Sequence, residues 1–181
     1  MASFLIMHGR QLDPIQADGN CLYRALSKQL ANDPEQHSNL RATLVKFAAY
    51  NVETFKSWVT SSPSEILQKT PEVRLKDHLD AVSKLGSWGT QLEIVAAATL
   101  FQVDIYVATD SLVKGECRWT RFTPLKGNTK VPNLYGFQKS LECKCWIEIA
   151  YENQCHYNNV LPLFKNMKNT KLLFPPRLIQ N

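Results

Sequence analysis

The stretch Asp18-Gly19-Asn20-Cys21-Leu22-Tyr23-Arg24-Ala25-Leu26 joins a short polar turn to a segment with the apolar pattern of a helix. Apolar residues recur at helical spacing after the turn, at Leu22, Ala25, Leu26 and Leu30. This spacing places Cys21 at or just before the first turn of the predicted helix. Unpaired N–H groups and the positive end of the helix dipole stabilise a thiolate at that position. Because the thiolate is the nucleophilic form, Cys21 is a candidate nucleophile; the alternative is a buried cysteine at an ordinary loop–helix junction.

The residues before Cys21 favour a tight bend. Asp18 and Gly19 permit a backbone turn that aims N–H groups at a neighbouring oxyanion. We expect the backbone from Asp18 through Gly19 and Asn20 to Cys21 to supply these N–H groups as an oxyanion hole.

A nucleophilic thiol needs a base, and three of the four histidines lie in segments that do not favour this role. His8 lies in a short terminal segment, and His37 follows a polar loop. His78 lies on a charged helix, where we expect it to be solvated.

His156 differs, because it stands between two strand-like runs. A histidine at the start of a strand is held by the sheet and exposed at its end, which suits a general base. Asn158 is two residues further, so both side chains share one face of the strand. Its amide oxygen would accept from the imidazole N–H and fix the tautomer. A surface histidine in a hairpin turn and a turn-forming asparagine are the alternatives.

Three separated segments resemble the ovarian-tumour (OTU) family of cysteine proteases, a class of deubiquitinating enzymes. Asp18–Ala25 resembles the signature Asp-Gly-x-Cys-Leu-(Phe/Tyr)-Arg-Ala. Trp88–Ala98 resembles the segment Trp-Gly-x-x-x-Glu-Leu-x-Ala-x-Ala. The third segment, Ile147–Ile149 followed by His156–Asn158, resembles the terminal strand and the catalytic His-Tyr-(Asn/Asp). The three segments occur in order and span most of the chain.

The resemblance implies a role for each matching residue. Cys21 matches the nucleophile, His156 the general base and Asn158 the residue that orients the imidazole. That last position is Asp in many members, and Asn stabilises an imidazolium less than a carboxylate would. Asp18 matches the acidic residue of the cysteine loop, which is often counted among the catalytic residues. We expect it to shape that loop and its oxyanion hole, with a direct role in the triad as the alternative.

Two aromatic residues are candidates for binding the substrate. We expect Trp88 to pack beneath the Cys21 region, with a wall of the substrate groove as the alternative. Tyr157 faces away from His156 and Asn158 if the strand is regular. It would either pack in the core or wall a narrow channel for a Gly-Gly tail.

Helices precede strands along the chain, which predicts an α+β fold with a sheet flanked by helices. The resemblance implies that this central sheet is mainly antiparallel, in the OTU-type papain-like cysteine protease arrangement. We expect helices at about 22–30, 40–58, 65–84 and 91–101, the last one beginning at a capping box, Thr90-Gln91-Leu92-Glu93. Pro71 makes the start of the third helix uncertain. Strands are expected at 103–108, 117–123, 144–151 and 156–163. We expect one catalytic domain over residues 1–165 and a partly ordered tail over 166–181.

Composition restricts the partners and the compartment. The net charge of +5 arises from scattered basic residues, so we expect no nucleic-acid partner. No apolar run is long enough for a membrane span or a signal core. Five cysteines without a repeating framework indicate a reducing compartment, the cytoplasm or nucleus. Cys143 and Cys145 form only a Cys-x-Cys pair, so we expect no metal and no cofactor. We expect a monomer.

The resemblance therefore implies a cysteine-dependent deubiquitinase that hydrolyses isopeptide or peptide bonds after the C-terminal glycine of ubiquitin, alone or in polyubiquitin chains. Three alternatives remain: a noncatalytic ubiquitin-binding module, a thiol protease for a ubiquitin-like modifier, and another thiol enzyme with the same Cys-His-Asn order.

Overall fold

The computed structural model describes residues 1–110, 117–131, 136–140, 146–163 and 175–176. Its α-helices are α1 (Ala2–Met7), α2 (Cys21–Ala31), α3 (His37–Tyr50), α4 (Val52–Phe55), α5 (Pro63–Gln68), α6 (Pro71–Val82) and α7 (Gln91–Phe101). Short 3₁₀ turns occupy Pro34–Gln36 and Lys56–Trp58. The strands are β1 (Arg10–Asp13), β2 (Asp104–Asp110), β3 (Cys117–Phe122), β4 (Trp146–Glu152) and β5 (His156–Pro162).

The described strands form one sheet in the order β1-β5-β4-β2-β3. Neighbouring strands run antiparallel except β2 and β4, which are parallel. The predicted α+β fold with a mainly antiparallel sheet is therefore confirmed. The β4–β5 hairpin closes with Glu152 opposite His156, and this register places the predicted base at one end of the sheet.

Both faces of the sheet are covered. On one face, Ile105, Val107, Ile147 and Ile149 join a large core with the apolar sides of α2, α3, α6 and α7. On the other face, alternate residues such as Tyr106 pack with Leu5 of α1 and Trp119 of β3. The two-residue period of the strands thus divides the apolar residues between two layers.

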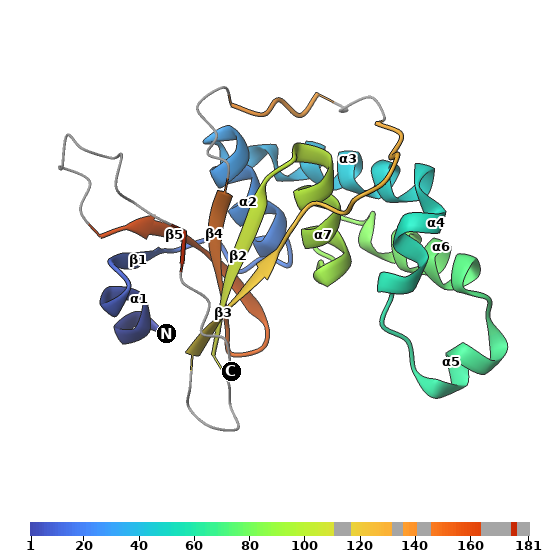
Figure 1. The fold of residues 1–181 in the computed structure, drawn as a ribbon, viewed down its shortest axis with the longest axis horizontal. Helices are drawn as coiled ribbons and strands as arrows, with labels where there is room; N and C mark the ends of the chain where they lie inside the picture. The colour runs from blue at the N-terminus through green and yellow to red at the C-terminus, as the bar shows by residue number, and fades with distance from the viewer. Residues whose placement is uncertain (111–116, 132–135, 141–145, 164–174, 177–181) are drawn as a thin grey trace.

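The helices spread unevenly around the sheet. Figure 1 shows α4 and α6 together at the opposite end of the molecule from α1, with α5 projecting beyond them. The helix α2 packs against β5 and β4 as well as α3. The residue that begins α2 therefore lies close to the strand that begins with His156.

Most predicted elements occur, with differences at their ends. The capping box before α7 is present, because Glu93 Oε2 accepts from the Thr90 N–H at 2.5 Å. The helix predicted over 65–84 is two helices, because Pro71 is the first residue of α6, a position where proline loses no helical hydrogen bond. Likewise the helix predicted to reach residue 58 ends at Tyr50, and a short helix and a 3₁₀ turn follow.

Two described elements, α1 and β1, were not predicted from the sequence. The strand β1 pairs with β5 from Arg10 opposite Pro162 to Asp13 opposite Asn159. Cys143, Cys145 and all of the predicted tail except residues 175–176 lie outside the described residues. None of the described helices has the length and apolar character needed to cross a membrane.

Candidate active site

Cys21 is the first residue of α2 and is 6% exposed. Its Sγ accepts a hydrogen bond from the backbone N–H of Tyr157 at 3.5 Å. The contact joins residues 136 positions apart and places the thiol beside the first residues of β5. The structure thus brings the candidate nucleophile to the strand that holds the candidate base.

His156 and Asn158 share one face of β5, as the strand period predicts. His156 Nε2 lies 3.1 Å from Asn158 Oδ1. The same oxygen accepts from the backbone N–H of Ile15 at 3.0 Å, and Asn158 Nδ2 donates to Glu152 Oε2 at 2.7 Å. Asn158 is 8% exposed, and every polar atom of its side chain has a partner.

These partners determine the tautomer of His156. A backbone N–H only donates and a carboxylate only accepts, so Oδ1 of Asn158 must face Ile15 and Nδ2 must face Glu152. Because Oδ1 is an acceptor, His156 Nε2 must carry the proton in their hydrogen bond. In the neutral ring, Nδ1 is then the basic nitrogen.

Asp18 holds the loop before Cys21. Its Oδ1 accepts from the Asn20 N–H at 2.9 Å, and its Oδ2 accepts from Arg24 Nε at 3.0 Å. Burial opposes ionisation of Asp18, but hydrogen bonds from Arg24 and Asn20 outweigh it and lower the pKa of the carboxyl to about 2. Arg24 also pairs with Glu35 at 2.6 Å. Asp18 therefore acts in the structure through the shape of its loop.

The side chain of Asn20 connects this loop to two other segments. Its Oδ1 accepts from Arg41 Nη2 of α3 and from the Gly86 N–H, both at 2.8 Å. Gly19 has a φ of +76°, and a Cβ there would lie 2.0 Å from the Gly86 oxygen. The cysteine loop (residues 18–20) and the loop before α7 (residues 86–90, here the Gly86 segment) are therefore in direct backbone contact, at a position that only glycine allows.

The expected oxyanion donors are not equivalent. The Asn20 N–H already donates to Asp18, so it is occupied in this structure. Cys21 is the first residue of α2, and an N–H at that position has no acceptor within the helix. The Cys21 N–H is therefore a better candidate than the Asn20 N–H to donate to a developing oxyanion.

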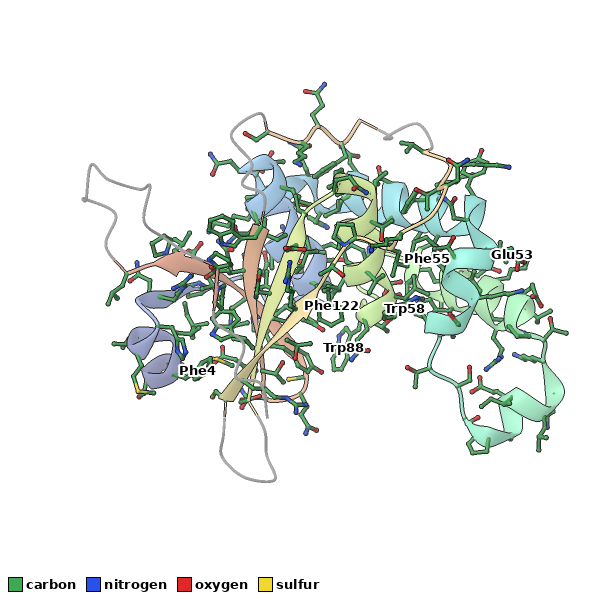
Figure 2. All side chains as sticks on the ribbon, viewed as in Figure 1. Phe4, Glu53, Phe55, Trp58, Trp88 and Phe122 are labelled. Carbon is green, nitrogen blue, oxygen red and sulfur yellow. The ribbon has the colours of Figure 1, made fainter. Side chains whose placement is uncertain are left out.

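An open groove with a volume of about 450 Å³ lies beside the site. It is lined by residues of the Gly86 segment, α7 and the sheet, among them Trp88, Gly89, Ile94, Phe122, Tyr151 and Tyr157. Figure 2 shows Trp88 and Phe122 between the sheet and the helices α4 to α6. Trp88 is 62% exposed, so the expectation that it packs beneath Cys21 is wrong and the groove-wall alternative fits the structure.

Tyr157 is half-buried, and its ring lies 4.5 Å from that of Tyr151. Burial raises the pKa of the Tyr157 phenol, which keeps the group neutral. The tyrosine therefore packs against Tyr151 and also lines the groove.

His78 and His37 differ from their sequence-based expectations. His78 is not solvated: its Nε2 lies 2.9 Å from Oε1 of Glu93, a carboxylate only 1% exposed. Glu93 thus has a second partner besides the capping box. His37 begins α3 and is buried, and burial lowers the pKa of its imidazole.

Two residues near the site, Arg41 and Glu152, were not predicted from the sequence. Arg41 is 1% exposed, lies 3.8 Å above the Tyr23 ring and donates to the Val82 oxygen at 2.6 Å. A signal for it existed, because Arg41 falls on the apolar face of α3 that Leu44 and Ala48 define. Glu152 gave no such signal. Within the described ranges, His, Cys, Asp and Glu form no group of three that would hold a metal ion.

Comparison with known proteins agrees with this geometry. The sequence model of the family described as OTU-like cysteine protease matches residues 16–157. The chain is 30% identical over 158 residues to the ovarian tumor domain-containing deubiquitinating enzyme 9 of Arabidopsis thaliana, covering 87% of this chain and 37% of the relative. It is 28% identical over 151 residues to ubiquitin thioesterase otu2 of Schizosaccharomyces pombe, covering 81% of this chain and 44% of the relative. The chain thus spans less than half the length of either relative.

Solved structures share the fold at lower identity. The OTU domain of OTUD1 superposes with a TM-score of 0.65 and 20% identity, covering 88% of this chain and 91% of that domain. The Hazara virus OTU bound to ubiquitin gives a TM-score of 0.57 and 18% identity over 90% of this chain and 87% of that one. With the family match over more than half of its length, the chain belongs to the OTU-like cysteine protease family.

Proposed function

We propose that this chain is a cysteine-dependent deubiquitinase that hydrolyses the isopeptide or peptide bond after the C-terminal glycine of ubiquitin. The observation that carries the proposal is the arrangement of three groups beside an open groove: Cys21 at the start of α2, His156 at the start of β5 and Asn158 hydrogen-bonded to His156 Nε2. Two relatives are named for deubiquitination or ubiquitin thioester cleavage, and two structural neighbours were solved with ubiquitin.

The first half of the reaction forms a thioester. His156 Nδ1 takes the proton from Cys21 Sγ, and the thiolate attacks the carbonyl carbon of the terminal glycine. The N–H groups of Gly19 and Cys21 donate to the resulting oxyanion. The C–N bond then breaks, the electron pair goes to the leaving amine, and the imidazolium gives that amine its proton.

The second half regenerates the thiol. His156 Nδ1 takes a proton from water, and the hydroxide oxygen attacks the thioester carbonyl. The C–S bond breaks, the sulfur recovers the proton from the imidazolium, and the glycine carboxylic acid leaves and gives its proton to solvent. Asn158 holds the ring in one orientation through both halves, because its Oδ1 accepts from Nε2 in both protonation states.

The groove determines how the substrate enters. Trp88 and Tyr157 line it from two different segments, the loop before α7 and the start of β5. We assign these residues to contacts with the extended tail of ubiquitin, whose two terminal glycines carry no side chains and pass between aromatic walls.

A ubiquitin probe with a C-terminal electrophile tests the proposal. The intact chain should form one covalent adduct, on Cys21, as identified by mass spectrometry of the peptide. Cys21→Ala should remove the adduct and the cleavage of diubiquitin, while urea unfolding shows an intact fold. Cys155→Ser is the matched control, because Cys155 is exposed near the site and is not assigned a role.

The alternatives give different results in the same experiment. An adduct only with a ubiquitin-like probe would assign the enzyme to that modifier. Binding of ubiquitin by the folded protein without any adduct or cleavage would refute catalysis and favour a binding module. An adduct that persists in Cys21→Ala would refute the assigned nucleophile.

A further inference from the structure

Glu152 contacts the asparagine of the candidate triad. It is the last residue of β4 and stands opposite His156 in the β4–β5 pairing. Its Oε2 accepts a hydrogen bond from Asn158 Nδ2 at 2.7 Å. The polar chain therefore continues past Asn158 and ends on a carboxylate, which the expected Cys-His-Asn set does not include.

The carboxylate first determines the orientation of the Asn158 amide. A flipped amide would place its oxygen against the Glu152 carboxylate and its NH₂ group against the Ile15 N–H, two repulsive contacts in place of two hydrogen bonds. Asn158 is nearly buried, so solvent does not compensate for these losses. With Oδ1 held toward His156, the imidazole keeps its proton on Nε2 and its basic nitrogen is Nδ1.

The carboxylate also adds charge. A neutral asparagine stabilises an imidazolium less than an aspartate does. A negative group hydrogen-bonded to the far side of an amide polarises it, which makes its oxygen a stronger acceptor. We propose that Glu152 is a positioning residue that orients Asn158 and, through its amide, supplies the imidazolium of His156 with the negative charge that the triad itself lacks. This inference rests on the proposed function.

The first test separates charge from hydrogen bonding. Glu152→Gln retains an oxygen that accepts from Asn158 but removes the charge. We expect kcat for a fluorogenic ubiquitin substrate to fall about tenfold with KM unchanged, since a charged partner strengthens a hydrogen bond by roughly 1.4 kcal/mol. Asp104→Asn is the matched control, because it removes a carboxylate from the opposite end of the same sheet.

The second test moves the negative charge from residue 152 to residue 158. In an Asn158→Asp background, the new carboxylate would face Glu152 at hydrogen-bond distance, and two adjacent carboxylates disfavour joint ionisation. Adding Glu152→Gln to Asn158→Asp should then raise kcat about tenfold, the reverse of its effect in the native chain. A merely structural Glu152 would give the same loss in both backgrounds, and that result would overturn the inference.

A substrate-free measurement distinguishes this inference from the proposed function. The rate at which iodoacetamide alkylates Cys21, followed on its peptide, reports the thiolate–imidazolium pair without ubiquitin. We expect Glu152→Gln to slow alkylation in the native background and to accelerate it in Asn158→Asp. Equal rates in all four proteins refute the role of Glu152 whether or not ubiquitin is cleaved. If Glu152→Gln folds poorly in urea titrations, Glu152→Ala replaces it, and the same reversal is required.

Discussion

Arg41 Nη2 donates to Oδ1 of Asn20, the residue before the candidate nucleophile, at 2.8 Å. The same guanidinium donates to the Val82 oxygen and lies over the ring of Tyr23. A residue of α3 therefore fixes the loop that begins α2 and ties it to the end of α6. A buried cation thus holds the loop before Cys21 in place.

Arg41→Met is expected to destabilise the fold by about 2–4 kcal/mol, because it removes two charge-assisted hydrogen bonds made by a buried side chain. Urea unfolding measures this change. Arg121→Met, which removes an exposed pair with Asp104, should cost less than about 1 kcal/mol. Similar losses for both variants would show that Arg41 is no more important than a surface arginine.

Gly19→Ala tests the contact between the cysteine loop and the Gly86 segment. The added Cβ would collide with the Gly86 oxygen, and alanine is also strained at the positive φ of this position. We therefore expect loss of cleavage and at least about 3 kcal/mol of destabilisation. Gly9 has a similar φ of +67° but nothing within 4 Å of an added Cβ. Gly9→Ala should therefore cost only about 1–2 kcal/mol and retain activity, and equal effects would exclude the close approach as the cause.

The contacts of Arg41 with Asn20 and of Gly19 with Gly86 show what could not be predicted from the sequence. The start of α2, the Thr90 capping box and the common face of His156 and Asn158 are local patterns, and each could be predicted from residues at most a few positions apart. The Arg41–Asn20 contact joins residues 21 positions apart. No local period encodes such a pair, although an arginine on an apolar helix face indicates a buried partner.

The missed elements have similar causes. The strand β1 has four residues and no alternation of buried and exposed positions, so it gave no strand signal. His78 was expected in solvent because its neighbours on α6 are charged, and only the folded structure shows that it meets Glu93 of α7. Trp88 was expected to pack beneath the Cys21 region, but its loop leaves it exposed beside the groove.

The pH dependence of folding should change when Asp18 is replaced. The pKa of this carboxyl is about 2 in the folded protein and near its ordinary value of 3.8 in the unfolded chain. A lowered folded-state pKa adds stability above the unfolded pKa, and this stability is lost as the pH falls from about 4 to about 2. We expect Asp18→Asn to cost about 2 kcal/mol at neutral pH.

The quantity to measure is the difference in the free energy of unfolding between the native chain and Asp18→Asn, because other carboxyls such as that of Glu72 also have a lowered pKa in both proteins. The difference in unfolding free energy should stay constant above about pH 4 and shrink toward zero near pH 2. Urea titrations across this range measure it. A difference that does not vary with pH would show that the loss comes from packing alone.

Trp88→Ala tests whether the exposed tryptophan serves the substrate and not the fold. The side chain is 62% exposed, so its removal should change the free energy of unfolding by less than about 0.5 kcal/mol. A large aromatic side chain at the wall of a binding groove is a frequent source of binding energy, and we expect KM for the ubiquitin substrate to rise about tenfold with kcat little changed. Leu85→Ala is the matched control, since Leu85 is 65% exposed nearby but does not line the groove. A large loss of stability with unchanged KM would return Trp88 to the packing role that the sequence first indicated.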